Sequence, residues 1–194
     1  MAGKANAILR RQIEVRGKLW PEISEEMTWN RIARDGFVTL PRAMPLIMRI
    51  MDYLAGKGIP VSQVYLDLWC RTFDEAFLQI TKTEEMATYA GFSGQRAVRT
   101  WKERLSKLAE LGFIDLKYGL TKEVVFALIL NPYHVIAQAY AKGLVPIEMW
   151  NALMVRAAEI GASDLDDVGN DGEYVQGVRP SLKKLTRHPR TKAP

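Results

Sequence analysis

Residues 81–130 constrain the fold of this chain more than any other stretch. The spacing of their apolar residues and glycines predicts a short helix and a longer one separated by a tight turn, with two strands following at once. In order, these segments are residues 82–90, 94–111, 113–117 and 123–130. This order of helix, helix, strand and strand predicts a fold that is mainly α with a small β-hairpin.

Several residues in this stretch suit the ends of the predicted elements. Thr81 and Glu84 have the spacing of a capping box, in which a hydroxyl and a carboxylate each satisfy a free backbone donor. Ser93 can cap the longer helix, and Gly112 can end it in the left-handed conformation. The second strand is apolar throughout rather than alternating, which predicts that both of its faces are covered.

Further helices are expected on both sides of this region, because glycines and prolines delimit other apolar patterns of helical period. They comprise one helix ending near Trp20, one from Pro21 to Gly36, one over 41–56, one over 62–71 capped by Ser62, and a pair over 133–142 and 146–160. Residues 76–80 suit either a short strand or a continuation of the preceding helix.

The composition changes beyond Gly161. Residues 163–174 are acidic, loop-like and poor in large apolar side chains. Residues 178–194 contain six Lys or Arg, no Asp or Glu and three prolines, so they cannot bury enough apolar surface to offset their ordering entropy. The expected organisation is an N-terminal helical extension (1–40), a central domain (41–131), a C-terminal helical pair (132–161) and a flexible acidic-then-basic tail (162–194).

Charge and cysteine content narrow the class of protein. The 27 basic and 22 acidic residues give a net charge of +5, which mildly favours an acidic partner such as nucleic acid. Cys70 is the single cysteine, and we expect it to be a buried structural thiol in a reducing compartment. The longest apolar run, Val124–Leu130, is too short to span a bilayer, and residues 1–15 do not suit a secretory signal. A cytoplasmic protein without a membrane partner is expected.

The order of elements over about residues 41–131 resembles the winged helix-turn-helix family, which includes prokaryotic transcription regulators and plasmid replication initiators. The most specific part is 81–117, with its capped short helix, tight glycine-containing turn, longer helix ending in LAELGFI and immediate hairpin. The resemblance implies that 94–111 is the recognition helix, that 117–122 is the tip of the wing, and that double-stranded DNA is the partner.

The longer helix has two chemically distinct faces. At 100° per residue, Val98, Trp101, Leu105 and Leu108 share one side, and basic and polar residues occupy the other. We expect bases to be contacted by Gln95, Arg96, Arg99 and Thr100, phosphates by Lys102, Lys107, Lys117 and Lys122, and further backbone contacts to come from Ser93 and Tyr118. Such a basic face is also typical of an ordinary solvated helix, in which Glu103 pairs with Arg99 one turn back.

Two alternatives concern partners other than DNA. The winged helix could be the scaffold of a protein-interaction adaptor whose working surface is formed by the flanking helices 1–35 and 133–161. A homodimer contact is also expected through residues 146–160, where an apolar stripe is formed by Met149, Trp150, Leu153 and Met154. The competing interpretation is that this stripe packs on the chain's own core.

Enzyme chemistry finds little support in the sequence. His134 and His188 are the only histidines, and neither lies among residues with metal-ligand spacing. There is no glycine-rich phosphate loop, and no set of side chains meets the geometric requirements of nucleophilic catalysis. We therefore expect a binding protein with no cofactor and no metal.

Overall fold

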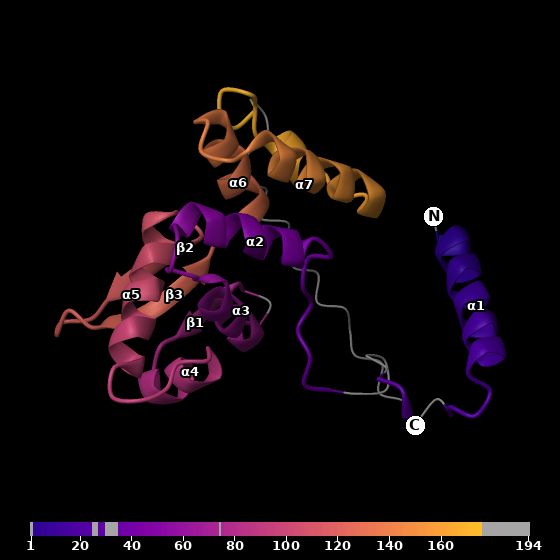
Figure 1. Cartoon of the computed structure of the whole chain (residues 1–194), viewed down its shortest axis with the longest axis horizontal. Coiled ribbons are helices and arrows are strands. Elements are labelled where there is room, and N and C mark those ends of the chain that lie inside the picture. The colour runs from indigo at the N-terminus through magenta and orange to yellow at the C-terminus, as the bar shows by residue number, and fades with distance from the viewer. Residues whose placement is uncertain (1, 25–26, 30–34, 74, 176–194) are drawn as a thin grey trace. The chain divides into compact units, whose positions relative to one another are not determined.

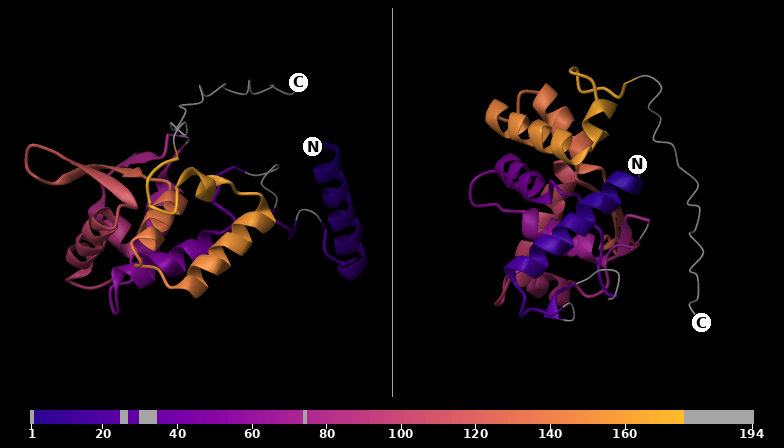
Figure 2. Two further views of the ribbon diagram at one scale, coloured as in Figure 1. Left: turned by 90° about the horizontal axis from the view of Figure 1, so that it is seen from above. Right: turned by 90° about the vertical axis from the view of Figure 1, so that its right-hand side faces the viewer.

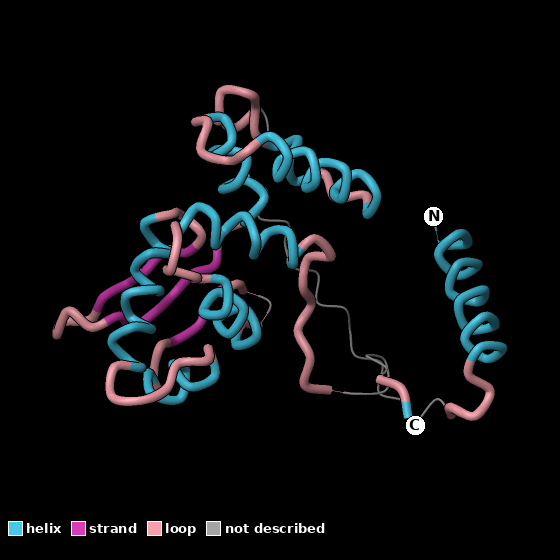
Figure 3. The backbone as a smooth tube through the Cα atoms, in the orientation of Figure 1, coloured by secondary structure: helices cyan, strands magenta, loops and turns pink. Residues whose placement is uncertain are grey.

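The computed structural model describes residues 2–24, 27–29, 35–73 and 75–175 (Figure 1). The chain divides into two compact units, residues 1–37 and 38–194. The described residues contain seven α-helices and one three-stranded antiparallel sheet, which confirms a mainly helical fold with a small hairpin (Figure 3).

The elements follow one another in the order α1 (Ala2–Leu19), α2 (Met44–Ala55), α3 (Ser62–Arg71), β1 (Phe77–Gln79), α4 (Thr83–Tyr89), α5 (Ala97–Glu110), β2 (Ile114–Tyr118), β3 (Val124–Ile129), α6 (Pro132–Ala141), α7 (Ile147–Ile160) and the short 3-10 helix η2 (Asp164–Asp167).

The first unit contains α1, whose predicted end near Trp20 is confirmed. The second helix predicted in this unit, from Pro21 to Gly36, is not formed in its described residues, 21–24, 27–29 and 35–36, which contain no α-helix. The remaining residues of that prediction lie outside the described part of the chain.

The sheet of the second unit has the strand order β1–β3–β2, with both pairs antiparallel. Residues 76–80 therefore contribute a separate strand rather than a continuation of α3. Ala127 in the central strand lies opposite Leu78 on one side and Leu116 on the other. These three side chains are buried, so they define the face of the sheet that packs on the helices.

The opposite face of the sheet is open, which corrects the expectation that both faces of β3 are covered. Phe126 and Leu128 are each 40% exposed, while Ala127 and Ile129 between and beside them are buried. An antiparallel sheet can keep one face in water, and the described helices cover only the other. The apolar character of the strand therefore does not reflect two buried faces.

The core lies between this sheet and the helices. Apolar residues at helical spacing supply it from α2, α3, α5 and α6, as the dense periodicity of those segments predicts. The largest fully buried side chains are Ile47, Ile50, Met51, Tyr65, Leu68, Met86, Trp101, Leu105, Leu108, Phe113, Ile114 and Ile136. Burial raises the pKa of the Tyr65 hydroxyl, which has no hydrogen-bond partner within the described residues.

A carboxylate from α2 caps the next helix. The Oδ1 atom of Asp52 accepts hydrogen bonds from the amides of Val61 (2.7 Å) and Ser62 (2.9 Å) at the start of α3. The Ser62 hydroxyl donates to the other carboxylate oxygen at 2.6 Å. Ser62 is thus the first residue of α3 and not its N-cap, because the cap comes from a different helix.

The start of α4 also differs from its prediction. Lys82 is the N-cap and makes no side-chain capping bond, so the capping box of Thr81 and Glu84 is not formed. The amide of Ile80 donates to the carbonyl of Val125 at 2.8 Å, which holds the chain to the sheet one residue before Thr81. The helix therefore begins two residues later than the predicted cap.

The two C-terminal helices are confirmed, and α7 lies alongside α2 (Figure 1). Leu153 is fully buried, and the Trp150 ring stacks on Tyr140 with centroids 4.4 Å apart. Met149 also packs against the core, whereas Met154 is 41% exposed. The stripe expected to form a dimer contact therefore packs mainly on the chain's own core.

The acidic segment after α7 is tied to α6, contrary to the loop-like character expected of it. The Asn131 amide donates to Oδ1 of Asp164 at 2.7 Å. The Nε2 atom of His134 lies 3.0 Å from Oδ2 of Asp167. These contacts place the carboxylates against polar groups at the start of α6.

Apolar burial supports the same segment. Leu165 and Val168 belong to the core, and Val168 pairs with Tyr174 in an isolated β-bridge. The two residues are enough to anchor a short stretch that is otherwise polar. The basic segment 178–194 lies outside the described residues.

Cys70 is exposed at the end of α3, so the expected burial of its thiol is wrong. Leu68 occupies the neighbouring core position instead. Partial desolvation and the carboxylate of Asp67 raise the pKa of the Cys70 thiol, which disfavours a reactive thiolate. Within the described chain, no helix combines the length and apolarity needed to cross a bilayer.

Candidate nucleic-acid interface

The turn between α4 and α5 is longer than predicted. The first residue of α5 is Ala97, its N-cap is Arg96, and no side chain caps it, so Ser93 does not have the predicted capping role. Gly94 takes a left-handed φ of 79°, and its carbonyl accepts from the amide of Ala97 at 3.1 Å. Gln95 and Arg96 therefore lie exposed in the turn that leads into α5, and not on the helix itself.

The two faces predicted for α5 are present. Trp101, Leu105 and Leu108 are buried against the rest of the unit. The Arg99 side chain is 80% exposed and that of Glu103 52% exposed. Burial of the apolar face fixes the orientation of α5, so its polar face is directed outward.

The basic residues of this surface are mostly paired with carboxylates. Arg99 Nε donates to Oε1 of Glu103 at 3.0 Å, as the spacing of one helical turn predicts. The Lys102 ammonium donates to Oε2 of Glu123 at 2.8 Å and so joins α5 to the hairpin. Two further pairs are Lys107–Glu110 (2.7 Å) and Lys117–Asp115 (2.7 Å).

Two cations of the candidate set differ from the others. Of the six Lys and Arg residues expected to contact DNA, Arg96 and Lys122 make no ion pair within the described part of the chain. Arg96 stands at the start of α5, and Lys122 stands in the hairpin loop with a left-handed φ of 61°. Their charges are therefore the ones most available to an anionic ligand.

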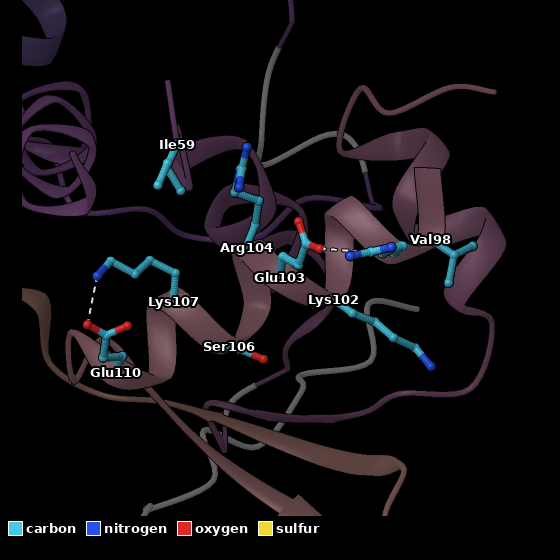
Figure 4. Close-up of a pocket in the computed structure, with 9 residues that line it drawn as sticks. Ile59, Val98, Lys102, Glu103, Arg104, Ser106, Lys107 and Glu110 are labelled. Carbon is cyan, nitrogen blue, oxygen red and sulfur yellow. Dashed lines mark hydrogen bonds and ion pairs between the residues drawn. The ribbon is translucent and has the colours of Figure 1, made fainter. Parts of the chain in front are cut away.

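An open groove of about 780 Å³ runs along the outward face of α5 (Figure 4). Its floor carries both charge signs, and one wall is formed by Ile59 from the loop between α2 and α3. The residues that line it are Ile59, Val98, Arg99, Lys102, Glu103, Arg104, Ser106, Lys107 and Glu110. Arg104 donates to the carbonyl of Gly58 at 3.3 Å, which ties that loop to the helix.

The hairpin tip carries an apolar side chain that the sequence analysis does not single out. Leu120 is fully exposed, and Tyr118 is 60% exposed. A Cβ at position 119 would lie 2.9 Å from Cγ2 of Val125, so a larger residue there would displace the Val125 side chain. Figures 1 and 2 show the β2–β3 hairpin projecting on the same side of the unit as α5.

The ten predicted residues are not equally exposed, and Lys117 lies beside Phe126 on the open face of the sheet. Exposed are Ser93, Gln95, Arg96, Arg99, Lys117, Tyr118 and Lys122, whereas Thr100, Lys102 and Lys107 are half-buried. Lys107 lies in the last turn of α5, away from the turn that carries Gln95 and Arg96. The exposed part of the set therefore consists of residues at the start of α5 and of Lys117, Tyr118 and Lys122 in the hairpin.

The described residues include no group of three or more His, Cys, Asp or Glu that could hold a metal ion. Comparison of the chain with protein-family models, with curated proteins and with solved structures finds no match in any of the three.

Proposed function

We propose that residues 41–131 form a winged helix-turn-helix domain that binds double-stranded DNA in a sequence-specific manner. The element order α2, α3, β1, α4, α5, β2, β3 supports this, as does the pairing of β1 with the hairpin strand β3. In this arrangement α5 is the recognition helix, and the β2–β3 hairpin is the wing.

The observation that carries the proposal is the position of exposed polar groups at the start of α5. Gln95 and Arg96 precede the helix, and Arg99 follows on its outward face. The N-terminal end of a recognition helix is the part that enters the major groove. Arg can contact guanine with two hydrogen bonds, and Gln can do the same with adenine, so these side chains suit base recognition.

The ion pairs on this surface do not oppose binding strongly. An exposed pair contributes at most about 1 kcal/mol, because water screens both charges. A phosphate can therefore replace the carboxylate of Glu103 or Glu123 as the partner of Arg99 or Lys102 at little cost. The wing adds Lys122, which has no carboxylate to exchange within the described residues.

The biological role that follows is transcriptional regulation, or the control of plasmid or mobile-element replication, in the cytoplasm. A homodimer belongs to the same proposal, because many helix-turn-helix proteins use twofold symmetry to read two half-sites. The stripe on α7 supplies little free surface for it beyond Met154.

The test is selection of bound fragments from the genomic DNA of the source organism by the full chain. We expect enrichment of a common motif, and an affinity that falls steeply with salt. Arg99→Ala should lose the preference at one position of the motif, whereas Arg156→Ala, which removes a similarly paired arginine on α7, should retain the whole motif. Absence of enrichment, or equal effects of the two substitutions, would refute the proposal.

A protein-interaction adaptor is the second candidate, and exposed apolar side chains on α7 favour it. Val155 is 60% exposed, Ile147 49% and Met154 41%, and the preceding Leu144 is 56% exposed. On this hypothesis Val155→Glu abolishes capture of a protein partner and Arg99→Ala is silent. DNA binding and partner capture are measured for both variants. Loss of DNA binding in Arg99→Ala, with Val155→Glu unaffected in both measurements, supports the DNA-binding function instead.

A further inference from the structure

The outer face of the sheet is an apolar surface that stays exposed among the described residues. Phe126, Leu128 and Leu130 alternate along the central strand and its extension, and they are 40%, 40% and 37% exposed. Phe77 on β1 is 50% exposed, and its ring lies 6.3 Å from that of Phe126. Four large apolar side chains therefore form one continuous patch, which we call the outer-sheet patch.

The strand register fixes how this patch is arranged. One row across the sheet is Phe77, Leu128 and Asp115, and the next row is Gln79, Phe126 and Lys117. The apolar centre is thus bordered on the β2 side by one acidic and one basic residue. The two are themselves 2.7 Å apart, so the border carries both signs and no net charge.

This charge arrangement selects among possible partners. A nucleic acid would face an apolar surface whose border has no net positive charge to attract its phosphates. A protein patch of one charge sign would leave either Asp115 or Lys117 facing a like charge. A partner that presents the same two charges in reverse order satisfies both, and a second copy of this chain does so when it is rotated by 180°.

We propose that the outer-sheet patch is the contact between two copies of the chain. The twofold axis runs across the strands, between the two rows of residues. It places Leu128 against Phe126 of the second copy, and Phe126 against Leu128 of the second copy. It also places Asp115 opposite Lys117 of the second copy, and the reciprocal pair forms by symmetry.

Packing of this kind buries the side chains that water contacts in the single chain. Two sheets stack face to face about 10 Å apart, a distance that interdigitated Leu and Phe side chains fill. Exposed apolar patches of this type commonly mark protein–protein contacts. The contact does not include α5, although Lys117 at its border is also one of the residues expected to contact DNA.

The first experiment measures the association of the full chain by sedimentation equilibrium. Leu128→Thr and Phe126→Thr keep strand propensity while they remove apolar contact area, and each should raise the dimer dissociation constant at least about tenfold. Val155→Thr is the matched control, because it makes a similar change at an exposed position on α7. A wild-type chain that stays monomeric, or a dimer weakened only by the control, would overturn the proposal.

The second experiment tests the charge register. Asp115→Lys and Lys117→Asp each place like charges opposite one another twice per dimer, so each should weaken association by about tenfold or more. The double variant with both substitutions restores opposite charges and should return the dissociation constant close to that of the wild type. Unfolding in urea verifies that each variant is folded. Equal association of all three charge variants, with the fold intact, would reject this geometry whatever the DNA-binding result.

Discussion

The ammonium of Lys102 on α5 lies 2.8 Å from the carboxylate of Glu123, the residue that precedes β3. The two side chains are 44% and 63% exposed, so the pair contributes little to stability. Its effect is on position and charge: it holds the hairpin to α5, and it neutralises a cation on the surface proposed to bind DNA.

Replacing Glu123 with Gln should release Lys102 for a phosphate. We expect tighter binding to all duplex sequences, and a slope of log affinity against log salt that is steeper by about 0.9, the value for one phosphate contact. Stability should change by less than about 1 kcal/mol. Fluorescence anisotropy at several salt concentrations measures the affinity. Glu148→Gln on α7 makes the same charge change elsewhere, and an equal slope in both variants would show that Lys102 has no phosphate partner.

Arg99→Ala should weaken DNA binding while it leaves the stability of the fold almost unchanged. An exposed arginine typically changes stability by less than about 0.5 kcal/mol. If its guanidinium contacts a guanine, binding should weaken by about 1–3 kcal/mol, with the preference lost at one base position. Arg99→Lys keeps the charge without the planar pair of donors and should lose the same preference. Anisotropy with single-base variants of the selected site detects this, and an unchanged preference in both variants would exclude Arg99 as a base reader.

Trp101 tests the inner face of the same helix. Its side chain is 1% exposed, and Trp101→Ala should lower the free energy of unfolding by about 3–5 kcal/mol because it leaves a cavity. The indole Nε1 is buried and has no hydrogen-bond partner in the described chain. Trp101→Phe should therefore cost less than Trp101→Ala, since it keeps most of the ring and removes an unsatisfied donor. Urea denaturation compares them, and equal losses would contradict the cavity argument.

The half-buried Asp52 carboxylate should contribute more to stability than an exposed carboxylate does. Asp52→Ala removes three hydrogen bonds at the start of α3 and should lower the free energy of unfolding by about 1–3 kcal/mol. Asp52→Asn retains an acceptor for the amides and should lose less. Asp35→Ala, in the first unit, is the control for removal of an exposed carboxylate. A loss no greater than that of the control would show that the cap is not stabilising.

Asp115 should titrate at lower pH than an ordinary aspartate. The hydrogen bond from the Lys117 ammonium lowers the pKa of the Asp115 carboxyl. Since the folded-state pKa lies below the unfolded value, the contact contributes stability above the unfolded pKa, and this contribution disappears as pH falls through the folded pKa. Lys117→Gln should move the pKa of Asp115 upward, as NMR titration of its side-chain carbon would detect. An unchanged pKa would mean that the pair does not persist in solution.

The sequence predicted the helices whose apolar spacing is dense and whose ends are set by the chain itself. Residues 41–56, 62–71, 133–142 and 146–160 all contain the expected helices, and Gly161 ends α7 with a left-handed φ of 69°. A glycine stop depends on local backbone freedom, so local sequence is sufficient to find it.

The predictions that failed depend on distant parts of the fold. Ser62 does not cap α3 because Asp52 from α2 provides the acceptor. Ser93 does not cap α5, whose first turn begins after the glycine turn at Gly94. The exposed face of β3 could not be inferred from its composition, since an apolar strand has the same pattern whether its second face is buried or open.

The contacts of the candidate site also differ in how far they could be predicted from the sequence. The Arg99–Glu103 pair follows from their spacing along one helix. The Lys102–Glu123 pair joins residues 21 positions apart, and its formation depends on the angle at which the hairpin leaves α5. Leu120 was missed because its complete exposure depends on how far the hairpin projects from the rest of the unit, which local sequence does not determine.

The Asp52 cap has a consequence for the order of folding. It closes a loop of about ten residues between α2 and α3, whereas the pairing of Phe77 with Leu128 closes one roughly five times longer and costs about 1.4 kcal/mol more in chain entropy. We therefore expect α2 and α3 to dock before β1 joins the sheet. Asp52→Ala should slow folding, while Leu78→Ala in β1 should mainly accelerate unfolding.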